Sequence, residues 1–162
     1  MCDVKSRLLS LSDAVEWKKS LAASGKRLVV TNGCFDIMHR GHVSYLEGAR
    51  NLGDALLVLL NSDASVRALK GESRPVVCED DRAFMLNSLR CVDRVVIFDG
   101  QRCDKELAAL APDIYVKAGD YTVETLDKTE RQALFDAETE IVFMPFVPGL
   151  STSSIIEKIK QS

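Results

Sequence analysis

The feature that most constrains the fold is an alternation of five short apolar runs with longer stretches of helical character. The runs are continuous, so each predicts a strand buried on both faces. They cover residues 26–32, 54–61, 93–99, 113–119 and 139–146. Strands of this kind, separated by helices, predict an α/β fold, namely a Rossmann-like, doubly wound, five-stranded parallel sheet with helices on both faces.

The segments between the runs carry helical patterns. The first helix is expected at about 12–24, with Ser12 or Asp13 as its cap and Gly25 as its stop. Further helices are predicted at 41–53, 62–69, 78–92, 103–112, 123–138 and 151–161. No internal repeat or linker divides the sequence, so we expect a single domain over 1–162 with its core at about 25–160.

Composition excludes several classes of protein. Of 162 residues, 46% are apolar and 28% are charged, which indicates a globular chain rather than a disordered one. No apolar run approaches the roughly 20 residues of a spanning helix, and the N-terminus lacks a signal-peptide core, so a cytoplasmic protein without a membrane partner is expected. The net charge of −3 argues against nucleic acid as the main ligand. Five cysteines without a CxxC pair predict reduced thiols.

Ligands of doubly wound sheets bind beyond the carboxyl ends of the strands, so the residues there are candidates for a site. TNGCFDIMHRGH follows the first strand and contains both histidines, His39 and His42. Three interpretations are open: packed core histidines, a metal site with Cys34, or a phosphate clamp. Gly33 allows a tight turn, and Gly41 leaves N–H groups accessible at a helix start, which favours the clamp. A structural zinc site needs further ligands, so no protein-bound metal is predicted.

Polar and basic residues follow three further strands. They are Asn61, Asp63, Lys70 and Arg74 after the second strand, Lys117, Gly119 and Asp120 after the fourth, and the hydroxyl run 151–154 after the fifth. Each has an ordinary alternative, because Asp63 and the hydroxyls can cap helices and a basic loop can simply be solvated. Cations and helix N-termini at one edge of a sheet together predict a phosphate-binding pocket. P-loop, dinucleotide and nucleophile-elbow motifs are absent.

These segments also resemble those of a known family. GCFDIMHRGHVSYL is similar to the GxFDxxHxGH signature of the nucleotidyltransferase superfamily that includes cytidylyltransferases. NSDASVRALKGESRPV, VKAGDY and STSSIIEKI extend the similarity to the adenylyltransferase domains of bifunctional heptose-phosphate kinase–adenylyltransferases. The resemblance covers roughly residues 25–160. It implies transfer of AMP from ATP to a sugar 1-phosphate, D-glycero-β-D-manno-heptose 1-phosphate, giving pyrophosphate and ADP-heptose for lipopolysaccharide.

The resemblance also implies roles for individual residues. His39, His42 and Lys70 would be catalytic, holding the triphosphate and stabilising charge on the reacting phosphate. ATP would arrive with Mg²⁺ on its phosphates. Contacts to the nucleotide are implied for Thr31, Asn32, Gly33, Cys34, Phe35, His39, Gly41, His42, Lys117, Gly119, Asp120, Tyr121, Ser151, Thr152 and Ser153. Contacts to the sugar phosphate are implied for Asn61, Asp63, Lys70 and Arg74.

Two departures from the family pattern matter. Ile156 stands where glycerol-phosphate cytidylyltransferases have an arginine, so Lys70, Arg74 or Lys117 must supply that charge. The sequence has no kinase pattern, so we expect a separate protein to make the sugar phosphate. A homodimer or larger homo-oligomer is expected by analogy. The alternatives are a cytidylyltransferase for ethanolamine phosphate or glycerol 3-phosphate, an FMN adenylyltransferase, and a nucleotide-binding module without catalysis.

Overall fold

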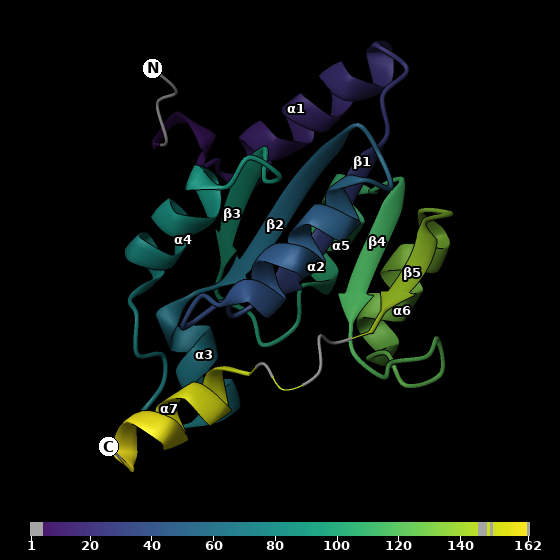
Figure 1. The fold of residues 1–162 in the computed structure, drawn as a ribbon. Coiled ribbons are helices and arrows are strands. Elements are labelled where there is room, and N and C mark those ends of the chain that lie inside the picture. The colour runs from purple at the N-terminus through teal and green to yellow at the C-terminus, as the bar shows by residue number, and fades with distance from the viewer. Residues whose placement is uncertain (1–4, 146–148, 150, 162) are drawn as a thin grey trace.

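Five parallel strands form the predicted sheet (Figure 1). The computed structural model describes residues 5–145, 149 and 151–161. The strands are β1 (Leu28–Gly33), β2 (Ala55–Asn61), β3 (Arg94–Phe98), β4 (Ile114–Ala118) and β5 (Glu140–Met144). Their spatial order is β3-β2-β1-β4-β5, so the direction of winding reverses between β1 and β4. A ligand site is therefore expected at the carboxyl ends of these two strands.

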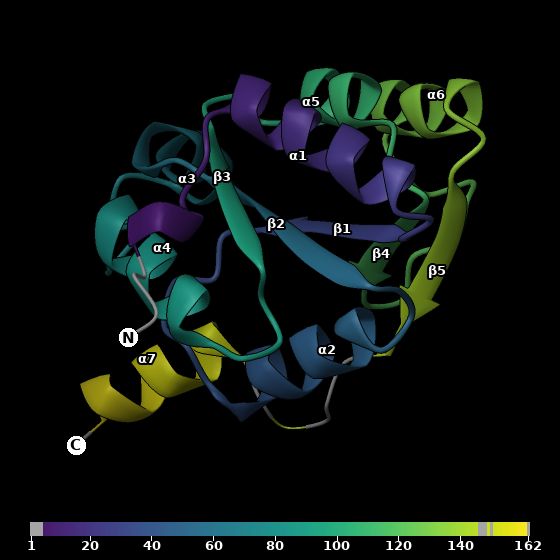
Figure 2. The same ribbon diagram turned by 90° about the horizontal axis from the view of Figure 1, so that it is seen from above.

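Helices cover both faces of the sheet, which confirms the doubly wound arrangement (Figure 2). One face carries α1 (Leu11–Ala23), α5 (Asp104–Leu110) and α6 (Lys128–Asp136), and the other carries α2 (Arg40–Arg50) and α4 (Glu79–Ser88). At the carboxyl edge lie α3 (Asp63–Lys70) and α7 (Thr152–Lys160) (Figure 1). A short 3₁₀ helix, η1 (Lys5–Arg7), precedes α1. None of the described helices is long and apolar enough to cross a membrane.

Neighbouring residues of each strand enter two different hydrophobic cores. Leu28, Val30 and Leu57 pack on the side of α1, α5 and α6. Val29 and Leu56 pack on the side of α2 and α4. All five are fully buried, because successive side chains of a strand point to opposite faces and both faces are covered. This is why the apolar runs are continuous in the sequence.

The structure corrects the start of the first helix. Its N-cap is Ser10, whose side chain accepts a hydrogen bond from the N–H of Asp13 at 3.1 Å, rather than Ser12 or Asp13. Gly25 follows the helix with a φ of +68°, as expected of a stop. Before the helix, Leu9 donates its N–H to the carbonyl of Val95, so the N-terminal segment lies along the edge of β3. The sequence pattern predicted no such contact.

Candidate active site

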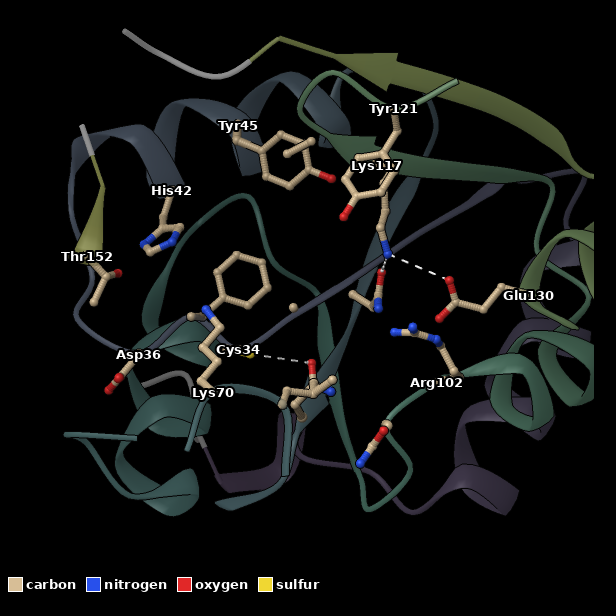
Figure 3. A pocket seen from close by; sticks show the side chains of 17 residues that line it. Cys34, Asp36, His42, Tyr45, Lys70, Arg102, Lys117, Tyr121, Glu130 and Thr152 are labelled. Atoms are coloured by element: carbon tan, nitrogen blue, oxygen red, sulfur yellow. Dashed lines mark hydrogen bonds and ion pairs between the residues drawn. The ribbon is translucent and has the colours of Figure 1, made fainter. Parts of the chain in front are cut away.

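A cavity of about 450 Å³ opens at the carboxyl ends of β1, β2 and β4 (Figure 3). It is the place at which the switch in strand order predicted a ligand. Of the residues predicted to form the site, those that line this cavity are Asn32, Gly33, Cys34, Phe35, His42, Asn61, Lys70, Lys117, Tyr121 and Thr152. The structure therefore brings together candidates that come from four separate segments of the chain.

The turn that follows β1 is shaped by Phe35. This residue has a φ of +43°, a conformation that non-glycine residues rarely adopt, and its side chain is buried. A Cβ on Gly33 would lie 2.9 Å from the Phe35 ring, so the glycine is required by the packing of that ring. Gly33 itself still belongs to β1, which corrects the expectation of a tight turn at this position.

His39 and His42 form a stacked pair at the start of α2. Their ring centroids are 3.9 Å apart with an interplanar angle of 20°, and His42 also lies 5.3 Å from the Phe35 ring. His39 is the N-cap of α2 but makes no side-chain cap. The Nδ1 atoms of both rings are shielded from solvent and have no hydrogen-bond partner among the described residues. Such buried polar atoms require an explanation, and a bound phosphate compound would supply acceptors.

The environment keeps both imidazoles neutral at pH 7. Burial, together with the nearby positive charges of His39 and Lys70, lowers the pKa of His42 to about 4. Burial also lowers the pKa of His39. A neutral imidazole donates one hydrogen bond, so the pair can offer two donors to phosphate oxygens without carrying charge of its own.

Binding of a triphosphate should change the protonation of His42. A polyanion stabilises the imidazolium, so the pKa of the bound state lies above about 4 and protons are taken up on binding at mildly acidic pH. Affinity for α,β-methylene-ATP should then rise as the pH falls from 7 towards 5. Calorimetry in buffers of different ionisation enthalpy measures the uptake at pH 5.5. His42→Gln serves as the non-titrating reference, and equal uptake in both proteins would contradict the prediction.

Asp36 fixes the loop that follows α3. Its buried carboxylate accepts hydrogen bonds from the Arg74 Nε at 2.6 Å and from the N–H groups of Val76 and Val77 at 2.9 Å each. Burial alone would raise the pKa of Asp36, but these hydrogen bonds bring it below its ordinary value. Arg74 is thus engaged within the protein. Lys70 lines the cavity and has no hydrogen bond or ion pair with the described residues, so it is the cation best placed for phosphate.

Arg82 joins the segments that surround the cavity. Its side chain is fully buried, and it donates to the carbonyls of Cys34 at 2.6 Å and Asn61 at 2.8 Å. It also donates to the carbonyl of Val77 at 2.9 Å and forms an ion pair with Asp63 at 2.7 Å. One guanidinium therefore holds together the ends of β1 and β2, the start of α3 and the loop before α4.

Lys117 lies across the cavity from Lys70 in Figure 3. Its Nζ donates to the Asn32 Oδ1 at 2.9 Å and to the Tyr115 hydroxyl at 3.1 Å, and it lies 3.8 Å from Glu130. The Tyr115 hydroxyl in turn donates to the Asn32 Oδ1 at 2.7 Å. These contacts hold the ammonium group at the floor of the cavity, whereas Lys70 stays exposed at its rim.

The hydroxyl residues at the start of α7 have two roles: some cap the helix, and one lines the cavity. Ser151 and Ser154 form a reciprocal capping box, and Ser153 is exposed. Thr152 alone of the three predicted hydroxyls lines the cavity, and its Oγ1 lies 3.5 Å from the carbonyl of Ile37. Part of the preceding segment lies outside the described residues, namely Phe146, Val147, Pro148 and Leu150.

Other predicted site residues lie away from the lining of the cavity. They are Thr31, His39, Gly41, Asp63, Arg74, Gly119, Asp120, Ser151 and Ser153. Thr31 is buried within β1 and hydrogen-bonds to the Tyr45 hydroxyl at 2.6 Å. Because Tyr45 donates to the carbonyl of Val116, Thr31 is the donor to Tyr45. The predicted ligand contacts of these residues remain predictions.

Sequence reasoning missed six residues that line the cavity. They are Asp36, Tyr45, Leu69, Gln101, Arg102 and Glu130. Tyr45 lies three residues after His42 on the same helix, so helical spacing could have indicated it. Gln101 and Arg102 follow β3, where the rule for strand ends applies equally.

The fold and site define an α/β domain with a cavity lined by His42, Lys70 and Lys117 at a topological switch point. Residues 30–158 match the cytidylyltransferase-like family, and the chain belongs to that family. The predicted membership of the HxGH nucleotidyltransferase superfamily is therefore confirmed, and with it a nucleotidyltransferase fold built around the histidine signature.

Individual relatives agree with this assignment. The chain is 48% identical over 156 residues to the bifunctional protein HldE of Helicobacter pylori, which is 96% of this chain and 32% of that protein. It is 51% identical over 138 residues to the bifunctional protein HldE of Citrifermentans bemidjiense. That alignment covers 85% of this chain and 28% of the relative. The chain thus spans about a third or less of the length of these curated relatives. A solved lipopolysaccharide core biosynthesis protein from Thermoplasma volcanium has 27% identity and a TM-score of 0.61, over 76% of this chain and 98% of that one.

Proposed function

We propose that the chain transfers AMP from ATP to D-glycero-β-D-manno-heptose 1-phosphate, giving ADP-heptose and pyrophosphate. The observation that carries the proposal is the meeting of His42, Lys70 and Thr152 in one cavity (Figure 3). Two imidazole nitrogens beside it lack partners among the described residues. The choice of sugar is supported by the segment resemblance in the sequence and by similarity to HldE and to a lipopolysaccharide core biosynthesis protein.

In the proposed reaction an oxygen of the acceptor phosphate attacks the α-phosphorus of ATP. The bond between that phosphorus and the α,β-bridging oxygen breaks, and pyrophosphate leaves with the electron pair. The acceptor is already anionic at neutral pH, so no general base is needed, and catalysis rests on positioning and electrostatics. His42 donates a hydrogen bond to the phosphates, while Lys70 offsets the repulsion between the two anions.

We propose that Mg²⁺ enters on the phosphates of ATP. Two acidic side chains line the cavity: Asp36 accepts a hydrogen bond from Arg74, and Glu130 accepts one from Cys103 and faces the Lys117 ammonium. Within the described part of the chain, no group of three or more His, Cys, Asp or Glu side chains is placed to hold a metal ion. This donor set fits a cation whose ligands are phosphate oxygens and water. When bound, the metal would neutralise phosphate charge.

Release of pyrophosphate tests the proposed function. Each of ATP and CTP is combined with heptose 1-phosphate, glycerol 3-phosphate, ethanolamine phosphate or FMN, with and without EDTA. We expect release with ATP and heptose 1-phosphate and its loss with EDTA. Faster release with CTP and an alcohol phosphate, or with ATP and FMN, would show that those compounds are the substrates instead of ATP and heptose 1-phosphate. Binding of ATP without release from any mixture would indicate a module without catalysis.

Replacement of Lys70 by alanine should lower turnover by about 100-fold, the scale expected for loss of one preorganised group. The thermal midpoint should not change, because the lysine is exposed and its side chain makes no hydrogen bond or ion pair with the described residues. Arg67→Ala is the matched control, since Arg67 is an exposed cation on the same helix that does not line the cavity. A loss of stability with normal turnover would assign Lys70 a structural role.

The proposal extends to the state of the protein in the cell. We propose a cytoplasmic homodimer or larger homo-oligomer without a nucleic-acid or membrane partner. The acidic net charge of −3 supports the absence of a polyanion partner, and the oligomer rests on analogy with the superfamily. Light scattering after size exclusion measures the oligomeric state.

A further inference from the structure

The proposed transfer leaves one wall of the cavity without a role. Gln101 and Arg102 come from the loop between β3 and α5, and Glu130 comes from the first turn of α6. We name these three residues the polar wall. In Figure 3, Arg102 and Glu130 lie across the cavity from His42, Thr152 and Lys70. The polar wall thus lies opposite the groups that we assign to phosphate.

Glu130 is a buried carboxylate with one oxygen available to the cavity. The residue is only 3% exposed. Its Oε1 accepts from the N–H and the thiol of Cys103, at 3.2 and 3.4 Å. Its Oε2 faces the Lys117 ammonium at 3.8 Å, which is longer than a hydrogen bond, and accepts no hydrogen bond from the described residues. A charged oxygen in this position retains the capacity to accept a hydrogen bond from a ligand.

Arg102 is held in place beside Glu130. Its Nε lies 3.0 Å from the carboxylate of Asp127, the residue that caps α6. That contact uses one edge of the guanidinium and leaves other N–H groups as donors. In Figure 3 the guanidinium extends towards Lys117 and Glu130. The neighbouring Gln101 adds an amide that can both donate and accept.

The charge of the wall indicates which part of a substrate it takes. Both proposed substrates are phosphates, and a buried carboxylate repels a phosphate. The same carboxylate accepts strongly from hydroxyl groups, while a guanidinium and an amide donate to hydroxyl oxygens. A ring bearing several hydroxyls satisfies all three side chains at once. The opposite side, with Lys70 and His42, is where the negative groups are stabilised.

We propose that Glu130, Arg102 and Gln101 form the subsite that recognises the hydroxyl groups of the acceptor sugar. The inference rests on the proposed function and adds the residues that determine which acceptor is used. The ribose of ATP has the same chemistry. The acceptor is favoured because Arg102 and Glu130 lie on the far side of the cavity from His42 and Thr152, which we assign to the triphosphate (Figure 3).

Kinetics of Glu130→Gln and Arg102→Ala test the subsite. We expect KM for heptose 1-phosphate to rise by about 10- to 100-fold, the range for loss of a hydrogen bond to a charged group. KM for ATP should stay within about 2-fold, because His42, Lys70 and Thr152, which we assign to the triphosphate, are unchanged. A larger rise in KM for ATP, together with loss of discrimination against 2′-deoxy-ATP, would assign the wall to the ribose and overturn the proposal.

Direct binding separates this inference from the proposed reaction. Calorimetry with heptose 1-phosphate, in the presence of α,β-methylene-ATP and Mg²⁺, reports the subsite even if the wild type releases no pyrophosphate. Weaker binding to both variants supports the subsite, whereas equal binding, or no binding to the wild type, overturns it. Deoxy analogues of mannose 1-phosphate allow a double-mutant cycle between protein and ligand. Removal of a hydroxyl that Glu130 binds should weaken binding to the wild type but have little further effect on binding to Glu130→Gln.

Two controls exclude a general loss of structure. Glu130→Gln keeps an oxygen for the N–H of Cys103, and circular dichroism should show an unchanged thermal midpoint. Arg102 has a side chain that is 53% exposed, so its truncation leaves the cores intact. Arg90→Ala, at an exposed position that does not line the cavity, should leave both KM values unchanged.

Discussion

Replacement of His42 by alanine should lower kcat by about 100- to 1,000-fold while the protein stays folded. The reason is that His42 is a neutral donor preorganised towards the cavity, and loss of one such donor costs this much in other enzymes. KM for ATP should change less than kcat, because Lys70 and Thr152, which we propose also bind the phosphates, remain in the cavity. Stopped or continuous assays of pyrophosphate release measure both constants.

Two further variants make the test specific to hydrogen bonding. His42→Gln keeps an N–H donor and should recover part of the lost turnover. His39→Ala should reduce turnover in the same direction, because it removes the ring that stacks on His42 at 3.9 Å. Near-normal kcat in His42→Ala would reject the phosphate clamp, whatever the effect on affinity.

The sheet could be predicted from the sequence because burial on both faces leaves a continuous apolar pattern within each strand. Val29 and Val30 point to opposite cores, and both must be apolar for the strand to be buried. Helix ends were less predictable. Residues 123–127 look helical, but Asp127 caps α6 and accepts from the N–H of Thr129 at 2.9 Å, so the helix starts at Lys128.

The signature histidines could be located because they stand three residues apart, between a buried strand and the helix that follows it. What the sequence could not give is which of those residues point into the cavity. Arg74 and Lys70 look equivalent in a basic loop, yet Arg74 pairs with buried Asp36 and Lys70 remains accessible. That distinction depends on contacts between positions 38 residues apart, which no local pattern encodes.

Glu130 illustrates the same limit from the other direction. In the sequence it lies inside the helix predicted at 123–138 and has no distinguishing pattern. In the structure its carboxylate reaches Cys103, 27 positions away, and lines the cavity. A buried acidic residue of this kind is recognised only once the loop after β3 has been placed beside α6.

Replacement of Arg82 by alanine should destabilise the protein by about 3–5 kcal/mol, the cost of breaking a buried ion pair. The side chain is fully buried, and its loss leaves Asp63 without its partner. Against a typical folding free energy of about 5–15 kcal/mol, this is a large fraction. Urea unfolding followed by circular dichroism measures the change. The exposed variant Arg90→Ala should stay within about 0.5 kcal/mol of the wild type.

Arg82→Met distinguishes the ion pair from the backbone contacts. A buried ion pair can often be replaced by an apolar residue at little cost, but only when no other polar group loses its partner. Here the carbonyls of Cys34, Asn61 and Val77 each accept from Arg82, and methionine cannot donate to them. Because unsatisfied buried acceptors remain, Arg82→Met should be almost as unstable as Arg82→Ala. Wild-type stability in Arg82→Met would show that Arg82 merely fills space between the strand ends.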